Sequence, residues 1–134
     1  MKSFHFKYSF SYRPLIKDYY PALIVGLNFN GTEADAMAII DTGASCTLFQ
    51  PGLATLLGIN ITSGIKKNMS TANGGDFSSY GHKIKIQIED SEIEEIIHFP
   101  INNIPRNLIG RNILKHYKFA LEEKYSQFHL SPEA

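Results

Sequence analysis

The chain has 134 residues, 43% of them hydrophobic and 12% aromatic, and its 13 basic and 13 acidic side chains give a formal net charge of zero. This length predicts one domain with one core, and the apolar content excludes a disordered chain. The balanced charge gives no support for nucleic acid or an anionic membrane surface as a partner, and no apolar stretch has membrane-spanning length.

Short strands are predicted in the first forty residues. Aromatic residues alternate with polar ones up to position 12, a period of two that is typical of a half-buried strand, and Pro14 ends this strand. A second strand over 20–29 leads to the hairpin signal Asn30-Gly31 and to a returning strand over 34–40.

A short helix is predicted over 51–57. Pro51 suits the first helical turn, and Gly58 is a natural helix end. Three leucines share the apolar face of this helix: Leu53, Leu56 and Leu57. The isoleucines at positions 59 and 61 alternate afterwards, as in a strand.

The second half of the chain is predicted to be a series of hairpins. An extended polar segment over 65–72 turns at Asn73-Gly74-Gly75-Asp76 and returns over 77–88. Three further elements follow: a strand over 93–101, a short helix over 110–117 and a last hairpin over 119–130. Many short strands with two short helices predict a mainly-β, barrel-like fold.

Cysteine, histidine and charge patterns limit the possible chemistry. Cys46 is the only cysteine, which excludes an intrachain disulfide, and we interpret it as a small core residue. The five histidines lack the spacing of metal ligands, so we expect them on the surface or hydrogen-bonded, and we expect no metal. The charge pairs Lys66-Lys67 and Glu94-Glu95 are expected on solvated faces. The N-terminus lacks the apolar core of a signal peptide, which favours a reducing, cytoplasmic setting.

One stretch carries candidate catalytic chemistry. The apolar residues Ala38-Ile39-Ile40 lead into a polar loop formed by Asp41, Thr42, Gly43, Ala44 and Ser45. A carboxylate at the end of a buried strand is costly unless something holds it, a threonine can hydrogen-bond beside it, and a glycine lets a ligand approach closely. A bare Asp-Thr-Gly also fits an ordinary strand-end turn, so both interpretations stay open for this stretch alone.

A second stretch favours the catalytic interpretation of the first. Asn107-Leu108-Ile109-Gly110-Arg111-Asn112-Ile113-Leu114 is an apolar pair, then a glycine, then a helix start. Together the two stretches resemble the two halves of the active-site motif of retropepsin-like aspartic proteases, and cellular and bacterial stand-alone members are the most similar. The resemblance covers residues 21–130 and implies an all-β, closed barrel-like acid protease fold, with one pepsin-like lobe per chain and two short helices. It also implies a single domain over 1–134 with a flap hairpin at about 65–88.

Aspartic protease chemistry needs two carboxylates, and this chain supplies one. Hydrolysis without a metal or a covalent nucleophile needs a base to activate water and an acid to protonate the carbonyl oxygen and the leaving amine. Two carboxylates that share one proton supply both roles, because like charges a few Å apart cannot both ionise. No other acid of the chain lies between an apolar strand and a glycine. The chemistry therefore predicts a homodimer in which Asp41 meets its own copy.

The resemblance implies roles for individual residues. Asp41 would be the catalytic carboxylate, Thr42 would hydrogen-bond across the dimer axis, and Gly43 would contact the substrate backbone. Two further residues would complete the active-site loop: Ala44 and Ser45. The hairpin tip would form a lid over the bound peptide, and its residues are Asn73, Gly74 and Gly75. Ile109 and Gly110 would pack behind the loop.

Three features depart from the family pattern. Viral members usually carry an acid at the position of Ser45 that pairs with the arginine at the position of Arg111, and a serine cannot form this ion pair, so the role of Arg111 stays open. The apolar helix within 50–58 is absent from the short viral enzymes. The hairpin over 119–130 is longer than the viral terminal strand, so a rearranged dimer surface and an isolated monomer are both open alternatives.

These residues predict an aspartic endopeptidase that hydrolyses peptide bonds with a water activated by two Asp41 carboxylates, one from each subunit, without a metal or cofactor. The protein or peptide substrate would bind as an extended strand under the flaps, and Phe77 or Tyr80 would either line its pocket or pack in the core. The alternative is a catalytically silent retropepsin-like module for dimerisation or peptide binding. A domain cut from a larger membrane protein or polyprotein is a third alternative.

Overall fold

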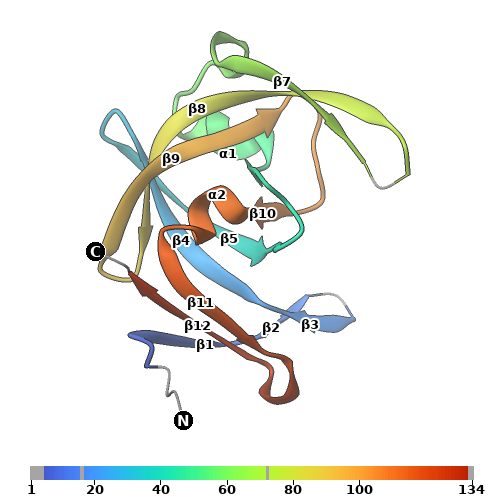
Figure 1. Cartoon of the computed structure of the whole chain (residues 1–134). Coiled ribbons are helices and arrows are strands. Elements are labelled where there is room, and N and C mark those ends of the chain that lie inside the picture. Colours follow the sequence, from blue (N-terminus) through green and yellow to red (C-terminus); the bar gives the residue numbers. More distant parts are fainter. Residues whose placement is uncertain (1–4, 16, 72, 133–134) are drawn as a thin grey trace.

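The structure is a computed structural model that describes residues 5–15, 17–71 and 73–132. Short strands make up most of it (Figure 1). The strands are β1 (Tyr8–Ser11), β2 (Arg13–Leu15), β3 (Asp18–Tyr20), β4 (Ala22–Phe29), β5 (Thr32–Ile40), β6 (Thr47–Leu48), β7 (Ile65–Ser70), β8 (Asp76–Ile88), β9 (Ser91–Pro100), β10 (Asn107–Ile109), β11 (Tyr117–Glu122) and β12 (Gln127–Pro132). The helical elements are α1 (Pro51–Leu56), η1 (Ile61–Ser63), α2 (Arg111–Leu114) and η2 (Glu123–Tyr125). Within these ranges no helix combines the length and apolar character needed to cross a bilayer.

Six strands close into a barrel (Figure 1). The hydrogen-bonded order around the ring is β4, β5, β10, β6, β9 and β8, and β8 pairs back onto β4 around Leu27 and Ile86. Most neighbours are antiparallel, but β10 lies parallel to β5 and β6 lies parallel to β9. β7 pairs with β8 outside the ring. This architecture confirms the predicted mainly-β, barrel-like acid protease fold.

The barrel interior holds the hydrophobic core. In β8 the isoleucines at 84, 86 and 88 are almost fully buried, whereas the polar residues between them are exposed. Phe49 and Phe99 are fully buried in the same core. Each large apolar side chain buried in this way contributes about 1.5–3 kcal/mol, so the barrel is held mainly by its interior and forms a firm base for the loops at its rim.

A second sheet joins the two ends of the described chain in the order β1, β12, β11 (Figure 1). Phe10 stacks on Phe128 with ring centroids 4.9 Å apart. Exposure alternates along the first strand as the period-2 pattern predicts, although the regular strand ends at Ser11. Pro14 does not end the extended segment, because it lies in β2 and faces Tyr19 in a separate two-stranded ribbon, whose edges tolerate a proline.

The turns follow local backbone preferences. Asn30 and Gly31 have φ of 50° and 89° and join β4 to β5, which confirms the predicted tight hairpin. The expected strand at Ile61 is wrong. Ile61 instead begins η1, where the N–H of Ser63 donates to the carbonyl of Asn60 at 3.1 Å.

Helix α1 confirms one prediction and corrects another. It starts at Pro51 and is followed by Gly58 with φ of 72°, as the helix signals indicate. Leu56, however, is 66% exposed and does not belong to the buried face. The residues that face the core are Leu53, Ala54 and Leu57. A helix of this length presents a single stripe to the barrel, and only the tertiary contact decides which stripe that is.

Candidate active site

The two sequence motifs lie side by side in the structure. Asp41 directly follows β5, and β10 runs parallel to β5 with Ile109 opposite Ile40. The backbone N–H of Asp41 donates a hydrogen bond of 2.9 Å to the carbonyl of Ile109. Two stretches that are far apart in the sequence therefore form one unit at the rim of the barrel.

Asp41 occupies a tight turn. Its carboxylate is half-buried, and Oδ1 accepts a hydrogen bond of 3.0 Å from the N–H of Gly43. The carbonyl of Asp41 accepts a second bond of 3.1 Å from the N–H of Ala44. Thr42 and Ser45 are exposed. The turn thus fixes one carboxylate oxygen through the backbone and leaves Thr42 exposed.

Gly110 is pressed against the back of this turn. A Cβ atom at Gly110 would lie 2.2 Å from the carbonyl oxygen of Cys46 and 2.9 Å from that of Ala44. The N–H of Gly110 donates to Oγ1 of Thr47 at 3.0 Å, and the N–H of Arg111 donates to the carbonyl of Ala44 at 2.8 Å. Only a residue without a side chain allows this approach between two backbones.

Arg111 begins α2, which is shorter than the predicted helix over 110–117. Its side chain is exposed, and no carboxylate of the described residues lies within ion-pair distance of its guanidinium. Ser45 contacts Cys46 Sγ at 3.7 Å instead. The connection of Arg111 to the loop is therefore made by its backbone N–H.

A cleft of about 820 Å³ opens beside Asp41. Three segments line it: the loop from Asp41 to Leu48, the β7 side with Lys67–Thr71 and Phe77, and the segment from Ile104 to Leu108. In the described part of the chain Asp41 is the only acidic side chain of this lining, and Lys67 and Arg106 are its only cationic ones. The remaining lining is largely apolar.

The cleft corrects one expectation from the sequence, because Cys46 is half-buried in the cleft wall and is not a core residue. Lys67 is exposed, as expected, and it also lines the cleft. Phe77 lines the cleft, whereas Tyr80 does not. The predicted hairpin tip lies beyond the lining residues, and Gly74 adopts a φ of 84° there. The tip residues are Asn73, Gly74 and Gly75.

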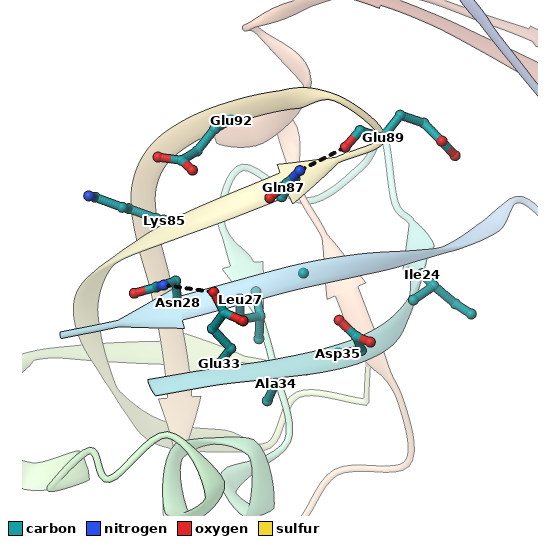
Figure 2. A pocket seen from close by; sticks show the side chains of 11 residues that line it. Ile24, Leu27, Asn28, Glu33, Ala34, Asp35, Lys85, Gln87, Glu89 and Glu92 are labelled. Carbon is teal, nitrogen blue, oxygen red and sulfur yellow. Dashed lines mark hydrogen bonds between the residues drawn. The ribbon is translucent and has the colours of Figure 1, made fainter. Parts of the chain in front are cut away.

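The other acids of β5 lie in a separate, polar hollow of about 340 Å³ on the outside of the barrel (Figure 2). Glu33 and Asp35 face it from β5, together with Lys85 and Gln87 from β8. This hollow shares no lining residue with the cleft at Asp41. Among the residues described, no three His, Cys, Asp or Glu side chains are grouped to hold a metal ion. Among the described residues, the lining of the cleft therefore offers no second carboxylate to Asp41.

Comparison with known protein families identifies the chain. Residues 25–116, more than two-thirds of the sequence, match the family model described as "gag-polyprotein putative aspartyl protease". The chain belongs to this aspartyl protease family. The match includes both motifs, and the enzyme class is that of the aspartic endopeptidases. No curated protein matches the sequence.

Two solved structures have the same fold as this protease. The EIAV protease in complex with the inhibitor HBY-793 is 20% identical and superposes with a TM-score of 0.57, covering 77% of this chain and 92% of that one. A retropepsin-like aspartic protease from Rickettsia conorii is 17% identical and superposes with a TM-score of 0.65 over the whole of both chains. At these identities the likeness concerns the fold, and it agrees with the barrel described above.

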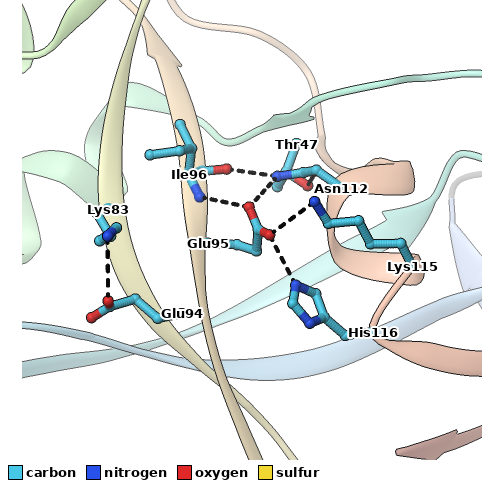
Figure 3. A network of polar contacts seen from close by, with 8 residues as sticks. All are labelled: Thr47, Lys83, Glu94, Glu95, Ile96, Asn112, Lys115 and His116. Atoms are coloured by element: carbon cyan, nitrogen blue, oxygen red, sulfur yellow. Dashed lines mark hydrogen bonds and ion pairs between the residues drawn. The ribbon is translucent and has the colours of Figure 1, made fainter. Parts of the chain in front are cut away.

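A polar network that the sequence did not indicate supports the loop of the protease from behind (Figure 3). Glu95 on β9, only 16% exposed, lies 2.9 Å from Nε2 of His116 and 3.4 Å from Nζ of Lys115. Its Oε2 also accepts the N–H of Ile96 at 3.2 Å. The expectation that Glu95 lies on a solvated face is wrong. The one available signal was the alternation Ile93, Glu95, Ile97, which places the acid among apolar residues.

The network continues from Glu95 to the active-site loop (Figure 3). Nδ2 of Asn112 lies 3.5 Å from Glu95 Oε2 and donates to the carbonyl of Ile96 at 2.9 Å. Oδ1 of Asn112 accepts a bond of 2.7 Å from Oγ1 of Thr47, which in turn accepts the N–H of Gly110. The side chain of Glu95 thus helps to hold the residues behind the loop.

We expect Glu95→Gln to lower the free energy of unfolding by about 1–2 kcal/mol at neutral pH, because charge-assisted hydrogen bonds are lost. Burial raises the pKa of Glu95, but His116, the N–H of Ile96 and Lys115 together outweigh it, so its net pKa lies below the ordinary value. A carboxyl group whose pKa is lower in the folded state than in the unfolded state stabilises the fold at pH values above the ordinary glutamate pKa. This stabilisation is lost as the pH falls through the pKa of the folded state.

Urea unfolding of the wild type and of Glu95→Gln, at neutral pH and at about pH 3, measures how much of the stability loss disappears in acid. The matched control is Glu94→Gln, since Glu94 forms only an exposed pair with Lys83 at 3.8 Å and should change stability by less than about 0.5 kcal/mol. A Glu95→Gln defect that is equally large at both pH values would contradict the assignment.

Proposed function

We propose that the protease is an endopeptidase that acts as a homodimer, with one Asp41 from each subunit forming the catalytic pair. The observation that carries this proposal is the cleft, in which Asp41 is the only acidic side chain among the described residues. Both halves of acid–base hydrolysis need a carboxyl group, so one chain lacks half of the machinery. The exposed Thr42 beside Asp41 is available for contacts across the two-fold axis.

The proposed chemistry follows from proton sharing. One Asp41 is ionised and takes a proton from the water held between the two carboxyl groups, while the other, protonated, donates its proton to the carbonyl oxygen of the substrate. The new C–O bond gives a tetrahedral diol. The Asp41 that took the proton from water then gives it to the nitrogen, while the other Asp41 takes a proton from a diol hydroxyl. The C–N bond breaks, an amine and a carboxylic acid are released, and the pair again holds one proton.

The hairpin β7–β8 supplies the proposed substrate wall. β7 has β8 as its one strand neighbour in the described sheet, so its other edge is available to an extended peptide. The apolar lining residues Leu48, Met69 and Leu108 provide surface for substrate side chains. We assign the tip at Asn73–Gly75 the role of a flap that closes on the bound peptide and excludes water.

The terminal strands bear on how the two subunits meet. β1 pairs with β12 from Tyr8–Leu130 to Ser11–Gln127 within one chain. A dimer sheet made from these strands must therefore use the free edges of β1 or β11, or the subunits must meet elsewhere. We also propose a cytoplasmic, reducing setting, in which Cys46 stays a free thiol in the cleft.

Activity measured against concentration tests the dimer. We expect peptide cleavage per chain to fall as the protein is diluted, in step with the loss of dimer measured by sedimentation, because each described chain brings one carboxyl group, that of Asp41, to the cleft. Constant cleavage per chain in samples that sediment as monomers would overturn the proposal. A dimer that binds extended peptides without cutting them between acid and neutral pH would identify the silent module instead.

A further inference from the structure

Lys67 is a cation placed on the wall of the cleft. It lies on β7, and its Nζ donates a hydrogen bond of 2.9 Å to Sγ of Cys46 in the loop that follows Asp41. The contact therefore joins the hairpin wall to the loop wall across the cleft. A thiol is a weak acceptor and uses one of the three N–H donors of an ammonium group, so the other donors remain for a ligand.

No acid of the described chain neutralises this cation. The ion pairs there join Lys7 to Asp90, Lys83 to Glu94, Lys115 and His116 to Glu95, and His129 to Glu122. None of them includes Lys67 or Arg106. Arg106 lies over the ring of Tyr20 at 4.7 Å. The cleft of one chain therefore carries two cations against one carboxylate, although the whole chain is neutral.

The charge of Lys67 also acts on its surroundings. Burial lowers the pKa of His98, and the ammonium of Lys67 and then His82 lower it further. His98 is 9% exposed and lies behind the cleft wall, with Nδ1 at 3.5 Å from Oγ of Ser79, whose hydroxyl also donates to the carbonyl of Lys67. A positive charge on His98 is therefore disfavoured beside Lys67.

We propose that Lys67, held against Cys46, forms a cationic subsite that selects an aspartate or glutamate side chain in the extended peptide substrate. This inference rests on the proposed function, because it places the substrate in the cleft at Asp41. An acidic side chain there pairs with the free N–H donors of Lys67, and the apolar remainder of the cleft takes its neighbours. Arg106 adds positive potential from the segment Ile104–Leu108 of the same lining.

The neighbouring residue Lys66 provides a matched control. Both lysines are exposed on β7, but Lys67 lines the cleft and Lys66 does not. Lys66→Gln therefore removes one positive charge from β7, as Lys67→Gln does, but leaves the cleft lining unchanged. Lys67→Glu reverses the sign of the subsite in the same place.

The test measures binding, which does not depend on turnover. Short extended peptides carry an uncleavable hydroxyethylene link and differ at one position at a time by Glu, Gln or Lys. At the position that faces Lys67 we expect the wild type to bind the Glu peptide more tightly than the Gln peptide by up to about fivefold, the upper end for an exposed ion pair. This preference should shrink as salt is added.

The variants decide the assignment. Lys67→Gln should abolish the Glu preference, Lys66→Gln should keep it, and Lys67→Glu should favour the Lys peptide. The subsite would be overturned if the wild type bound the Glu and Gln peptides equally at every position, or bound no peptide at all. It would also be overturned if Lys66→Gln and Lys67→Gln lost the Glu preference to the same extent. Acid-selective binding without cleavage of the matching amide peptides would leave the subsite standing and remove the proposed endopeptidase function.

Discussion

The Asp41→Asn variant is expected to lose about 10³-fold or more of kcat on a cleavable peptide, because an amide neither takes a proton from water nor shares one with its partner carboxyl. The fold should persist, since the carboxylate makes one backbone hydrogen bond, to Gly43, that the Oδ1 of an asparagine can also accept. The measurement is kcat beside the sedimentation mass and the unfolding midpoint of the same sample.

A matched control separates the site from general charge effects. Asp35 lies on β5, the strand that leads to Asp41, and it is exposed and faces the outer hollow rather than the cleft (Figure 2). Asp35→Asn should keep kcat within about twofold of the wild type, as surface substitutions away from a site usually do. Near-wild-type activity in Asp41→Asn would remove Asp41 from the mechanism.

Mixed dimers give a sharper outcome. When an equal amount of Asp41→Asn chain exchanges with a fixed amount of wild type, about half of the wild-type activity should remain, since wild-type chains in mixed dimers lose a functional partner. If each chain acted alone, the added variant would leave the activity unchanged.

Gly110→Ala is expected to destabilise the protease by at least about 2–3 kcal/mol, because the new methyl group meets backbone atoms that have little room to yield. Its Cβ would lie 2.2 Å from the carbonyl oxygen and 2.5 Å from the carbonyl carbon of Cys46. Relief requires a shift of the segment Ala44–Cys46, so we expect kcat to fall in any folded fraction. Urea unfolding and kcat measure the two effects.

Gly52→Ala is the control for a glycine-to-alanine change. Gly52 lies in α1, and a Cβ there meets nothing within 4 Å. Alanine favours the helix over glycine, so this variant should be as stable as the wild type or up to about 1 kcal/mol more stable. A Gly110→Ala protein with wild-type stability would show that β10 and the loop are not packed as described.

Local rules made much of this fold predictable. The hairpin at Asn30-Gly31 and the end of α1 at Gly58 depend on backbone conformations that a few neighbouring residues decide. The alternating isoleucines of β8 place one face in the core, and this follows from the strand period alone. Local patterns failed at Leu56, which is 66% exposed instead of facing the core, and at Ile61, which begins η1 instead of continuing a strand.

The sequence by itself determined the family of the protein, since the Asp-Thr-Gly loop and the glycine-arginine helix entry are recognisable without coordinates. Only the tertiary structure decided how they meet, through the parallel pairing of β5 with β10 and the close approach of Gly110 to Cys46. It also decided the surroundings of Glu95 and Lys67, which the sequence presents as ordinary charged pairs. The physical reason is the distance along the sequence over which each effect acts. Turns and strand periods depend on a few neighbouring residues, whereas burial and charge pairing depend on residues brought together by the closed barrel.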